Sequence, residues 1–308
     1  MTEYELESED CDMGKITDFS TVENLIANNI FLVDGGENGT RTITAANAIK
    51  SMLPMANRDA FFAMLDEIGN PILHRLIYRG KNLGTTFTTA QKEAIQAGTF
   101  TDIWLGDYWN FTEPGGDAKT FLVADFDYWL NCGDTGFTSH HIVVIPYSRL
   151  YTAKMNDTNT TEGGYYNSKM RGGTDGIASG NLARALTWYQ SAFGDALLTH
   201  RDSLSNAVTE DGKVAGVAWY DSIIDLPSEV MIYGARHRSE SDQYTTINKT
   251  QLALMQAAPK HIVFNNTQDY WLRDVAGTRG FVIGGYYGGT YYDSASNVGG
   301  VRPVAAIG

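Results

Sequence analysis

Apolar residues occur along the chain in short runs separated by polar and glycine-rich segments, which predicts many short strands joined by glycine-rich loops. Three stretches of strand length stand out in the middle of the chain: 102–109 (DIWLGDYW), 120–130 (TFLVADFDYWL) and 140–148 (HHIVVIPYS). Short apolar runs bounded by Gly, Pro, Asn or Asp are typical of strands. A further strand-rich segment closes the chain at 270–308.

The clearest helical period lies in 180–194 (GNLARALTWYQSAFG). Its apolar positions recur every three or four residues, so they share one side of the predicted helix. These positions are Leu182, Ala185, Leu186 and Tyr189. Gly194 follows the last of them and is expected to end the helix.

Two shorter helices are predicted from their end signals. Thr88 and Gln91 have the spacing of a capping box, which predicts a helix that begins at residue 89. The segment 248–259 (NKTQLALMQAAP) is expected to be helical up to Pro259, which cannot continue a helix.

The first 70 residues carry a separate pattern. Residues 1–14 are polar and acidic and predict a solvated tail. The elements expected after the tail are a helix over 20–26, strands over 30–34 (IFLVD) and 41–45 (RTITA) joined by a turn, and a helix over 44–53 that stops before Pro54. A module of this size buries little core, so residues 15–70 are expected to need neighbours, either other copies or a larger particle.

Composition narrows the class of protein. The formal net charge is −13, and no basic stripe is present, which argues against nucleic-acid binding. The apolar runs are too short to span a bilayer, and the acidic N-terminus lacks the apolar core of a signal peptide. Two cysteines, Cys11 and Cys132, make no disulfide framework. We expect a protein that is made in a cytoplasm and does not insert into a membrane.

The residues that could bind a metal or act as catalytic acids do not have the spacing that such sites need. His140 and His141 are neighbours in a predicted strand, so they point to opposite sides and cannot easily share a metal. Asp125 and Asp127 share one side of a predicted strand and could form an acid pair. A solvated outer side of the sheet is the favoured interpretation, because buried carboxylates are costly. We predict no metal, no cofactor and no enzymatic activity.

Two segments place an arginine directly beside an aspartate. They are 199–202 (THRD) and 271–274 (WLRD). Without a nucleophile or base nearby, these pairs are predicted to be structural ion pairs rather than catalytic groups.

Residues 278–300 have the most unusual composition of the chain, with many Gly and Tyr and no Lys, Glu, Gln, Trp or Met. Tyr supplies rigid contact area, and Gly, Ser, Asp and Asn supply adaptable hydrogen bonds, so this mixture is typical of recognition surfaces. The candidate ligand-binding residues are Tyr286, Tyr287, Thr290, Tyr291, Tyr292, Asp293, Ser294, Ser296 and Asn297. The alternative is a packed meander with Tyr buried on one side and Gly at the bends.

The segments around this stretch carry a resemblance. The residues concerned are Trp271 and Arg273 in YWLRDV, and Gly300, Val301, Arg302 and Pro303 in GVRPV. Their order resembles the C-terminal half of the C-type lectin fold, in the branch of formylglycine-generating enzymes and of the variable target proteins of diversity-generating retroelements. The resemblance implies that Trp271, Arg273, Arg302 and Pro303 are framework residues. Residues 78–308 as a whole look similar to virion proteins of phages from gut bacteria.

The retroelement branch fits the composition of 278–300. These elements rewrite adenines, often in Asn codons, which cannot produce Lys, Glu, Gln, Trp or Met. Pairs such as Gly284–Gly285, Tyr286–Tyr287 and Gly288–Gly289 fit paired variable codons. The enzymatic branch uses cysteine near the C-terminus, and none follows Cys132. The resemblance therefore implies a diversified binding surface at 278–300.

Together these patterns predict an α+β chain in three parts: an acidic tail (1–14), a small module (15–70) and a larger domain of short antiparallel strands with a few helices (71–308). The resemblance implies that 15–70 is an attachment and oligomerisation module and that 71–308 is a C-type lectin-like domain. The resemblance implies a phage adhesin, either a receptor-binding protein or a head or tail fibre, located on the virion surface. Residues 15–70 would bind capsid or tail proteins, the chain would form a homotrimer, and its ligand would be a host surface protein or glycan.

Two other functions stay open. One is a structural decoration protein of the capsid or tail without a specific receptor. The other is an enzyme acting on surface glycans, which would need Asp125 and Asp127 as an acid pair in a cleft. For the adhesin, replacing Tyr291 and Tyr292 by Ala is expected to abolish binding with little effect on thermal stability.

Overall fold

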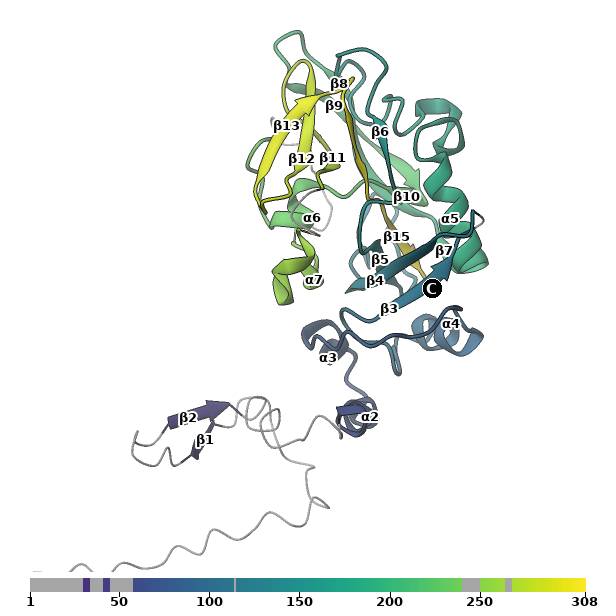
Figure 1. Cartoon of the computed structure of the whole chain (residues 1–308), viewed down its shortest axis with the longest axis vertical. Helices are drawn as coiled ribbons and strands as arrows, with labels where there is room; N and C mark the ends of the chain where they lie inside the picture. The colour runs from purple at the N-terminus through teal and green to yellow at the C-terminus, as the bar shows by residue number, and fades with distance from the viewer. Residues whose placement is uncertain (1–29, 34–40, 45–57, 114, 240–249, 264–267) are drawn as a thin grey trace, which may run out of the picture. The chain divides into compact units, whose positions relative to one another are not determined.

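The computed structural model describes residues 30–33, 41–44, 58–113, 115–239, 250–263 and 268–308 (Figure 1). The chain divides into two compact units, Met1–Met64 and Leu65–Gly308. The fold is α+β, with helices and predominantly antiparallel strands.

The described part of the first unit is mainly a two-stranded antiparallel hairpin. Strand β1 (Ile30–Val33) pairs with β2 (Arg41–Thr44), with Ile30 opposite Thr44. Both strands lie where the sequence predicts them. The acidic tail, Cys11, the helix over 20–26, the turn and the helix over 44–53 lie outside the described residues, apart from Thr44, which ends β2.

Helices in the described residues are short and lie mainly before and between the strands. They are α2 (Arg58–Ile68), α3 (Pro71–Leu76), α4 (Thr89–Gln96), α5 (Ala183–Phe193), α6 (Glu229–Tyr233), α7 (Ala253–Ala257) and the 3₁₀ turns η4 (Gly173–Asp175), η5 (Ile177–Ser179), η6 (Gly194–Ala196) and η7 (Pro259–His261). The predicted capping box of α4 is confirmed: Thr88 Oγ1 accepts from the Gln91 N–H at 3.2 Å, and Gln91 Oε1 accepts from the Thr88 N–H at 3.0 Å. Helix α5 ends at Gly194, which has φ 53°.

Helix α7 is shorter than the sequence predicts. The segment before it is held by other contacts: Tyr128 donates to the carbonyl of Thr250 at 2.8 Å, and the Gln251 amide donates to the carbonyl of Ile232 at 2.7 Å. These tertiary bonds hold 250–251 outside the helix, which the local pattern could not reveal.

The first large sheet is antiparallel throughout, in the order β10-β15-β5-β4-β3, with β7 also paired to β15. Its strands are β3 (Tyr108–Thr112), β4 (Ala118–Phe126), β5 (Ile142–Pro146), β7 (Leu197–Leu198), β10 (Ile224–Asp225) and β15 (Val304–Ile307). The strand prediction over 102–109 is wrong before Tyr108. The Asp107 carboxylate there accepts from the Trp104 N–H at 2.7 Å and folds the segment into a turn.

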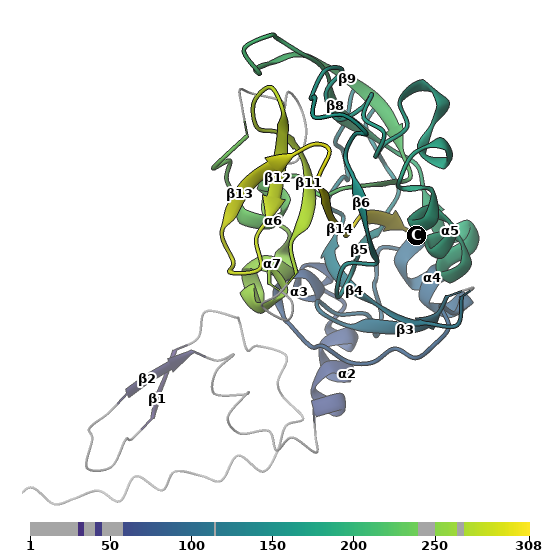
Figure 2. The same ribbon diagram turned by 45° about the horizontal axis from the view of Figure 1, so that its top comes forward.

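The second large sheet has the order β13-β12-β11-β14-β6 and contains the C-terminal hairpin. Its strands are β6 (Tyr151–Lys154), β11 (Tyr270–Val275), β12 (Gly280–Gly284), β13 (Thr290–Ser294) and β14 (Val298–Val301). Only the β11–β14 pair is parallel. A separate ribbon joins β8 (His200–Val208) to β9 (Val214–Ser222). Figure 2 shows β11–β13 on one side of this unit and α5 on the other.

The chain passes between the two large sheets four times, and two of these passages are corners that lie against each other. One corner joins β5 to β6, and the other joins β14 to β15 through Arg302. Arg302 is fully buried, and its Nε donates to the carbonyl of Pro146 at 2.9 Å and its Nη1 to that of His261 at 2.9 Å. Arg302 therefore ties both corners together and holds the second sheet in position.

Candidate functional site

The hairpin formed by β12 and β13 is the edge of the second sheet (Figure 1). Strand β12 is buried along its whole length, whereas β13, the outermost strand, is only partly covered. Gly284 pairs with Thr290 and Gly280 with Ser294, so residues 285–289 form the connecting turn. A buried strand thus supports an accessible strand and turn.

Three tyrosines of this hairpin are well exposed: Tyr286 by 46%, Tyr287 by 60% and Tyr292 by 61%. Among the described residues eight large apolar or aromatic side chains are exposed, and four of these, including Val298, lie between 286 and 298. Such a concentration of exposed aromatic area is typical of an interaction surface rather than of scattered surface residues.

Tyr286, Tyr287 and Tyr291 form a cluster at the turn, which we call the tyrosine cluster. The rings of Tyr286 and Tyr287 meet edge to face at 5.2 Å, and Tyr287 stacks on Tyr291 at 6.2 Å with 20° between the planes. Asp269 lies beneath the cluster: Oδ1 accepts from the Tyr286 N–H at 2.8 Å, and Oδ2 accepts from the Tyr291 hydroxyl. The exposed rings are therefore held by a carboxylate and by a third ring.

Tyr291 differs from its neighbours because it is partly buried and packs against the core. Burial raises the pKa of its hydroxyl, and the bond to Asp269 raises it further. These contacts lead us to expect that the double change Tyr291→Ala, Tyr292→Ala lowers stability through Tyr291, in contrast to the small effect expected from the sequence. Tyr291 holds the cluster against the core, and Tyr286 and Tyr287 are the members whose rings are exposed to solvent.

The glycines of the hairpin have a packing explanation. A Cβ on Gly289 would lie 2.7 Å from the Tyr287 ring, one on Gly285 3.1 Å from the same ring, and one on Gly284 2.6 Å from the Tyr270 ring. The rings lie directly over the backbone, so these three positions need glycine. Packing thus accounts for three of the four paired glycines without any appeal to variable codons.

The remaining candidate residues lie apart from the tyrosine cluster. Asp293 Oδ1 accepts from the Ser294 N–H and from the Asn297 amide, both at 2.7 Å, and so shapes the turn into β14. This turn begins about 13 Å along β13 from Thr290. Thr290, Ser294 and Ser296 are half-buried, and Asn297 is exposed.

Tyr292 belongs to neither group. It follows Tyr291 in the strand, so its side chain points to the opposite side of the sheet. A Cβ on Gly280 would lie 3.1 Å from its ring. The nine residues therefore form two groups at the ends of β13, with Tyr292 between them.

The four framework residues are all buried. Trp271 donates its indole N–H to the carbonyl of Ala153 at 2.9 Å, which joins β11 to β6 across β14. The carbonyl of Pro303 accepts from the Tyr189 hydroxyl at 2.7 Å. These contacts hold the sheet that carries the hairpin.

The two Arg–Asp segments form one ion pair between them. Arg273 in β11 donates to both carboxylate oxygens of Asp202 in β8, with Nη2 at 3.0 Å from Oδ1. Burial raises the pKa of Asp202, but the Arg273 guanidinium and His200 outweigh it and lower the pKa to about 2. Arg201 instead pairs with Asp134 at the surface, at 2.9 Å.

The predicted solvated position of Asp125 is wrong. Its carboxylate is fully buried, accepts from Arg75 Nε at 2.6 Å and accepts from the Ala253 N–H at 2.9 Å. A bulge after Val123 and the left-handed backbone of Asp127, φ 51°, separate the two aspartates. Asp125 therefore has a structural role, because Arg75 and the Ala253 N–H already bind its carboxylate.

His140 and His141 point to different environments. His140 is partly exposed and lies 2.8 Å from Asp127, whereas His141 is buried and accepts from the Trp129 N–H at 3.1 Å. Among the described residues no group of three or more His, Cys, Asp or Glu side chains could hold a metal ion. In the same part of the chain no helix is long and apolar enough to cross a membrane.

Sequence reasoning missed Asp269 and Tyr233. Asp269 directly precedes β11, and Tyr233 ends α6 and donates to the carbonyl of Gly289 at 2.9 Å. Both hold the turn from positions distant in sequence, and a lone carboxylate or tyrosine carries no local signal of that role.

Comparisons with known proteins give no relative for this chain. No family model, no curated protein and no solved structure matches it.

Proposed function

We propose that this chain is a non-enzymatic phage surface adhesin, and that the exposed tyrosines of the β12–β13 hairpin contact a host surface protein or glycan. The observation that carries the proposal is the tyrosine cluster. Tyr286 and Tyr287 are exposed, yet Tyr291 stacks on Tyr287 and Asp269 holds the backbone of Tyr286, beside the buried strand β12. Rigid aromatic side chains lose little entropy on binding, which favours them as anchors.

The C-type lectin-like assignment of residues 71–308 is part of the same proposal. The two segments that resemble that fold lie side by side, since Tyr270 of β11 pairs with Gly300 of β14 in parallel. The stretch between them forms the hairpin and the turn into β14. This arrangement supports a framework that flanks a binding surface.

Binding by the double variant Tyr286→Ser, Tyr287→Ser tests the proposal. Labelled full-length protein would be measured against a panel of gut bacterial isolates and against immobilised glycans. We expect at least about a tenfold loss of affinity, because buried aromatic anchors dominate interfaces. Tyr147→Ser is the matched control, an exposed tyrosine outside the hairpin. Equal binding by wild type and double variant would refute the role of the cluster.

Sequencing the 3′ end of the gene from many genomes of its source population tests the diversified-surface part. Variation concentrated in codons 278–300 at adenine-derived positions would support it. Gly284 packs against the Tyr270 ring and Gly285 against the carbonyl of Gly289, so we expect these two codons to stay glycine while those of Tyr286, Tyr287 and Tyr292 vary. An invariant 3′ end would remove diversification from the proposal.

A second candidate is a decoration protein that packs into the particle. Ile68, Ile72 and Leu76, at the end of α2 and on α3, are exposed apolar side chains of the kind that another subunit covers. Cryo-electron microscopy of the particle distinguishes the two functions. A hairpin exposed at a tip favours adhesion, and a hairpin buried against another subunit favours assembly.

A further inference from the structure

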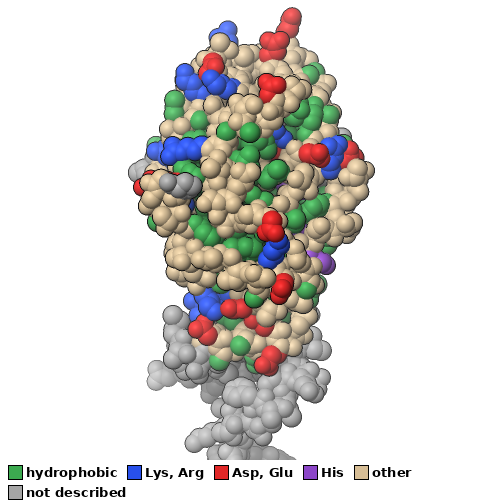
Figure 3. All heavy atoms as spheres, turned by 90° about the vertical axis from the view of Figure 1, so that its right-hand side faces the viewer, with side chains coloured by type: hydrophobic (Ala, Val, Ile, Leu, Met, Phe, Trp, Pro, Cys, Tyr) green, Lys and Arg blue, Asp and Glu red, His purple; other side chains and the backbone are tan. Residues whose placement is uncertain are grey.

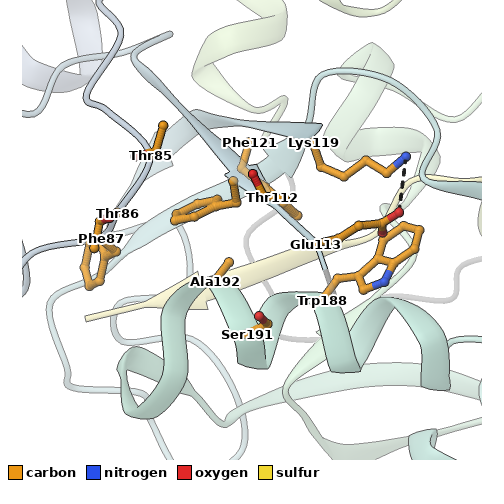
Figure 4. Close-up of a pocket in the computed structure, with 11 residues that line it drawn as sticks. Thr85, Thr86, Phe87, Thr112, Glu113, Lys119, Phe121, Trp188, Ser191 and Ala192 are labelled. Atoms are coloured by element: carbon orange, nitrogen blue, oxygen red, sulfur yellow. Dashed lines mark ion pairs between the residues drawn. The ribbon is translucent and has the colours of Figure 1, made fainter. Parts of the chain in front are cut away.

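A cavity of about 330 Å³ lies in the larger unit among α5, the paired strands β3 and β4, and the loop 85–87 (Figure 4). Figures 1 and 2 place α5 on the side of this unit away from the β12–β13 hairpin. On the α5 side, apolar side chains gather in the centre with few charged groups among them (Figure 3). The cavity is therefore distinct from the tyrosine cluster.

The cavity has an aromatic floor and a hydroxyl-bearing rim. Phe111, Phe121 and Trp188 are buried and form the floor, with Phe87 beside them. The exposed lining residues that carry hydroxyl groups are Thr85, Thr86, Thr112 and Ser191. Glu113 and Lys119 stand together at one end, near Trp188 (Figure 4).

Glu113 is the unusual residue of this cavity, because it is a carboxylate only 7% exposed. A tight turn fixes it: its N–H donates to the Asp117 carbonyl at 2.9 Å, and its carbonyl accepts from the Gly116 N–H at 2.8 Å. Oε1 lies 3.9 Å from Lys119 Nζ, while Oε2 is buried and has no hydrogen-bond partner among the described residues. Burial raises the pKa of Glu113.

A buried oxygen without a donor is costly and therefore calls for an explanation. Elsewhere in this unit a fully buried carboxylate such as Asp107 accepts from an arginine and from backbone N–H groups. Glu113 lacks such a set and lines an open cavity. The Glu113 side chain thus lines the cavity with an incomplete set of donors to its carboxylate.

The charges around the cavity select the class of ligand. Lys119 and Arg184 lie over the Trp188 ring, at 5.2 and 4.6 Å, so a cationic ligand would be repelled there. Asp117 lies beside Glu113, 3.9 Å from the same Lys119 ammonium, so the two carboxylates would repel an anion. A neutral ligand whose hydroxyl group donates to Oε2 meets neither obstacle.

We propose that this cavity binds one neutral sugar ring or a cyclic polyol of that size, with a hydroxyl donating to Glu113 Oε2. The apolar C–H side of such a ring would lie on the aromatic floor, and its other hydroxyls would meet the threonines and Ser191 at the rim. The volume is at the small end of ligand pockets, as one ring requires. This site does not rest on the function proposed for the hairpin.

Saturation-transfer NMR and calorimetry on the full chain test the site. The probes are neutral methyl glycosides of hexoses, 6-deoxyhexoses and N-acetylhexosamines. We expect at least one to bind, and Glu113→Gln to weaken it at least tenfold without lowering the melting temperature, since the variant removes a buried charge. Glu162→Gln, at an exposed glutamate, is the matched control and should bind as wild type.

A second variant tests the site independently, in case Glu113→Gln does not fold. Ser191→Phe places a large side chain at the exposed mouth and should also abolish binding. Tyr286→Ser, Tyr287→Ser should leave it unchanged, which separates this site from the hairpin. The proposal is overturned if no glycoside binds, if Glu113→Gln binds as wild type, or if glucosamine or glucuronate competes better than the neutral sugars.

Discussion

At the scale of single residues, the buried carboxylates of Asp107, Asp125 and Asp202 are surrounded by donors, in contrast to that of Glu113. Asp107 and Asp125 are each met by an arginine and by backbone N–H groups, and Asp202 is met by both arms of the Arg273 guanidinium. Burial disfavours a charged group unless such partners compensate for the lost water. These residues therefore contribute to the stability of the fold, and none of them is free to act on a ligand.

The pair between Asp202 and Arg273 should make folding stability depend on pH in the acid range. The pKa of Asp202 is about 2 in the folded protein and about 3.9 in an unfolded chain. A lowered folded pKa stabilises above pH 3.9, and the benefit is lost as pH falls from about 4 to about 2. The shift corresponds to about 3 kcal/mol.

Urea denaturation of wild type and Asp202→Asn between pH 6 and pH 2 measures this effect. The difference in unfolding free energy between the two proteins should shrink as pH falls below about 4. Parallel curves across the whole range would show that Asp202 does not titrate as the ion pair requires.

At the scale of elements, the β12–β13 hairpin combines a rigid base with accessible side chains. Strand β12 is buried, and the turn is held through Asp269 and Tyr233. A hairpin at a sheet edge is otherwise prone to move and to pair with other chains. Its anchoring suits a surface that must present Tyr286 and Tyr287 in one arrangement.

Removing a single hydroxyl should separate the supporting tyrosine from the exposed one. Tyr291→Phe removes the donor to Asp269 Oδ2 and is expected to lower the unfolding free energy by about 1–2 kcal/mol. Tyr292→Phe, the same change at an exposed neighbour, should stay within about 0.5 kcal/mol of wild type. Chemical denaturation at neutral pH compares them, and equal stabilities would contradict the anchoring by Asp269.

At the scale of the whole molecule, the larger unit contains one continuous core that both large sheets share. The two corners held by Arg302 lie at the junction, and side chains such as Trp271 and Tyr189 pack on either side of it. The chain crosses between the sheets twice within this junction. Leu65–Gly308 therefore has the core of an independently folding domain, whereas residues 15–70 are expected to need other copies.

Truncation before α2 tests this division of roles. A fragment of residues 58–308 keeps α2 whole and should unfold cooperatively within a few degrees of the full chain. Light scattering should find the full chain as a trimer and the fragment as a monomer, because oligomerisation is assigned to 15–70. A trimeric fragment would show that the larger unit makes the contacts between subunits. An unfolded fragment would show that the larger unit does not fold by itself.

Features with a local cause were open to prediction from the sequence. The capping box of Thr88 and Gln91, the end of α5 at Gly194 and the strands β1, β2, β4 and β5 depend on residues within a few positions of each other. Tyr286, Tyr287 and Tyr292 are exposed as a surface requires, but residues 280–285 of the same stretch are buried. Tyr291 does not follow that pattern, because its ring packs on the core and its hydroxyl reaches Asp269.

The sequence by itself determined the α+β character, the start of α4, the end of α5 and the unusual composition of 278–300, because hydrophobic period and capping act over a few residues. Only the tertiary structure decided that Asp125 is buried, that Arg273 pairs with Asp202, and that Glu113 meets Trp188 and Phe111 in one cavity. These partners lie tens of residues apart, and their contact follows from how the two sheets and α5 pack, which no local pattern records.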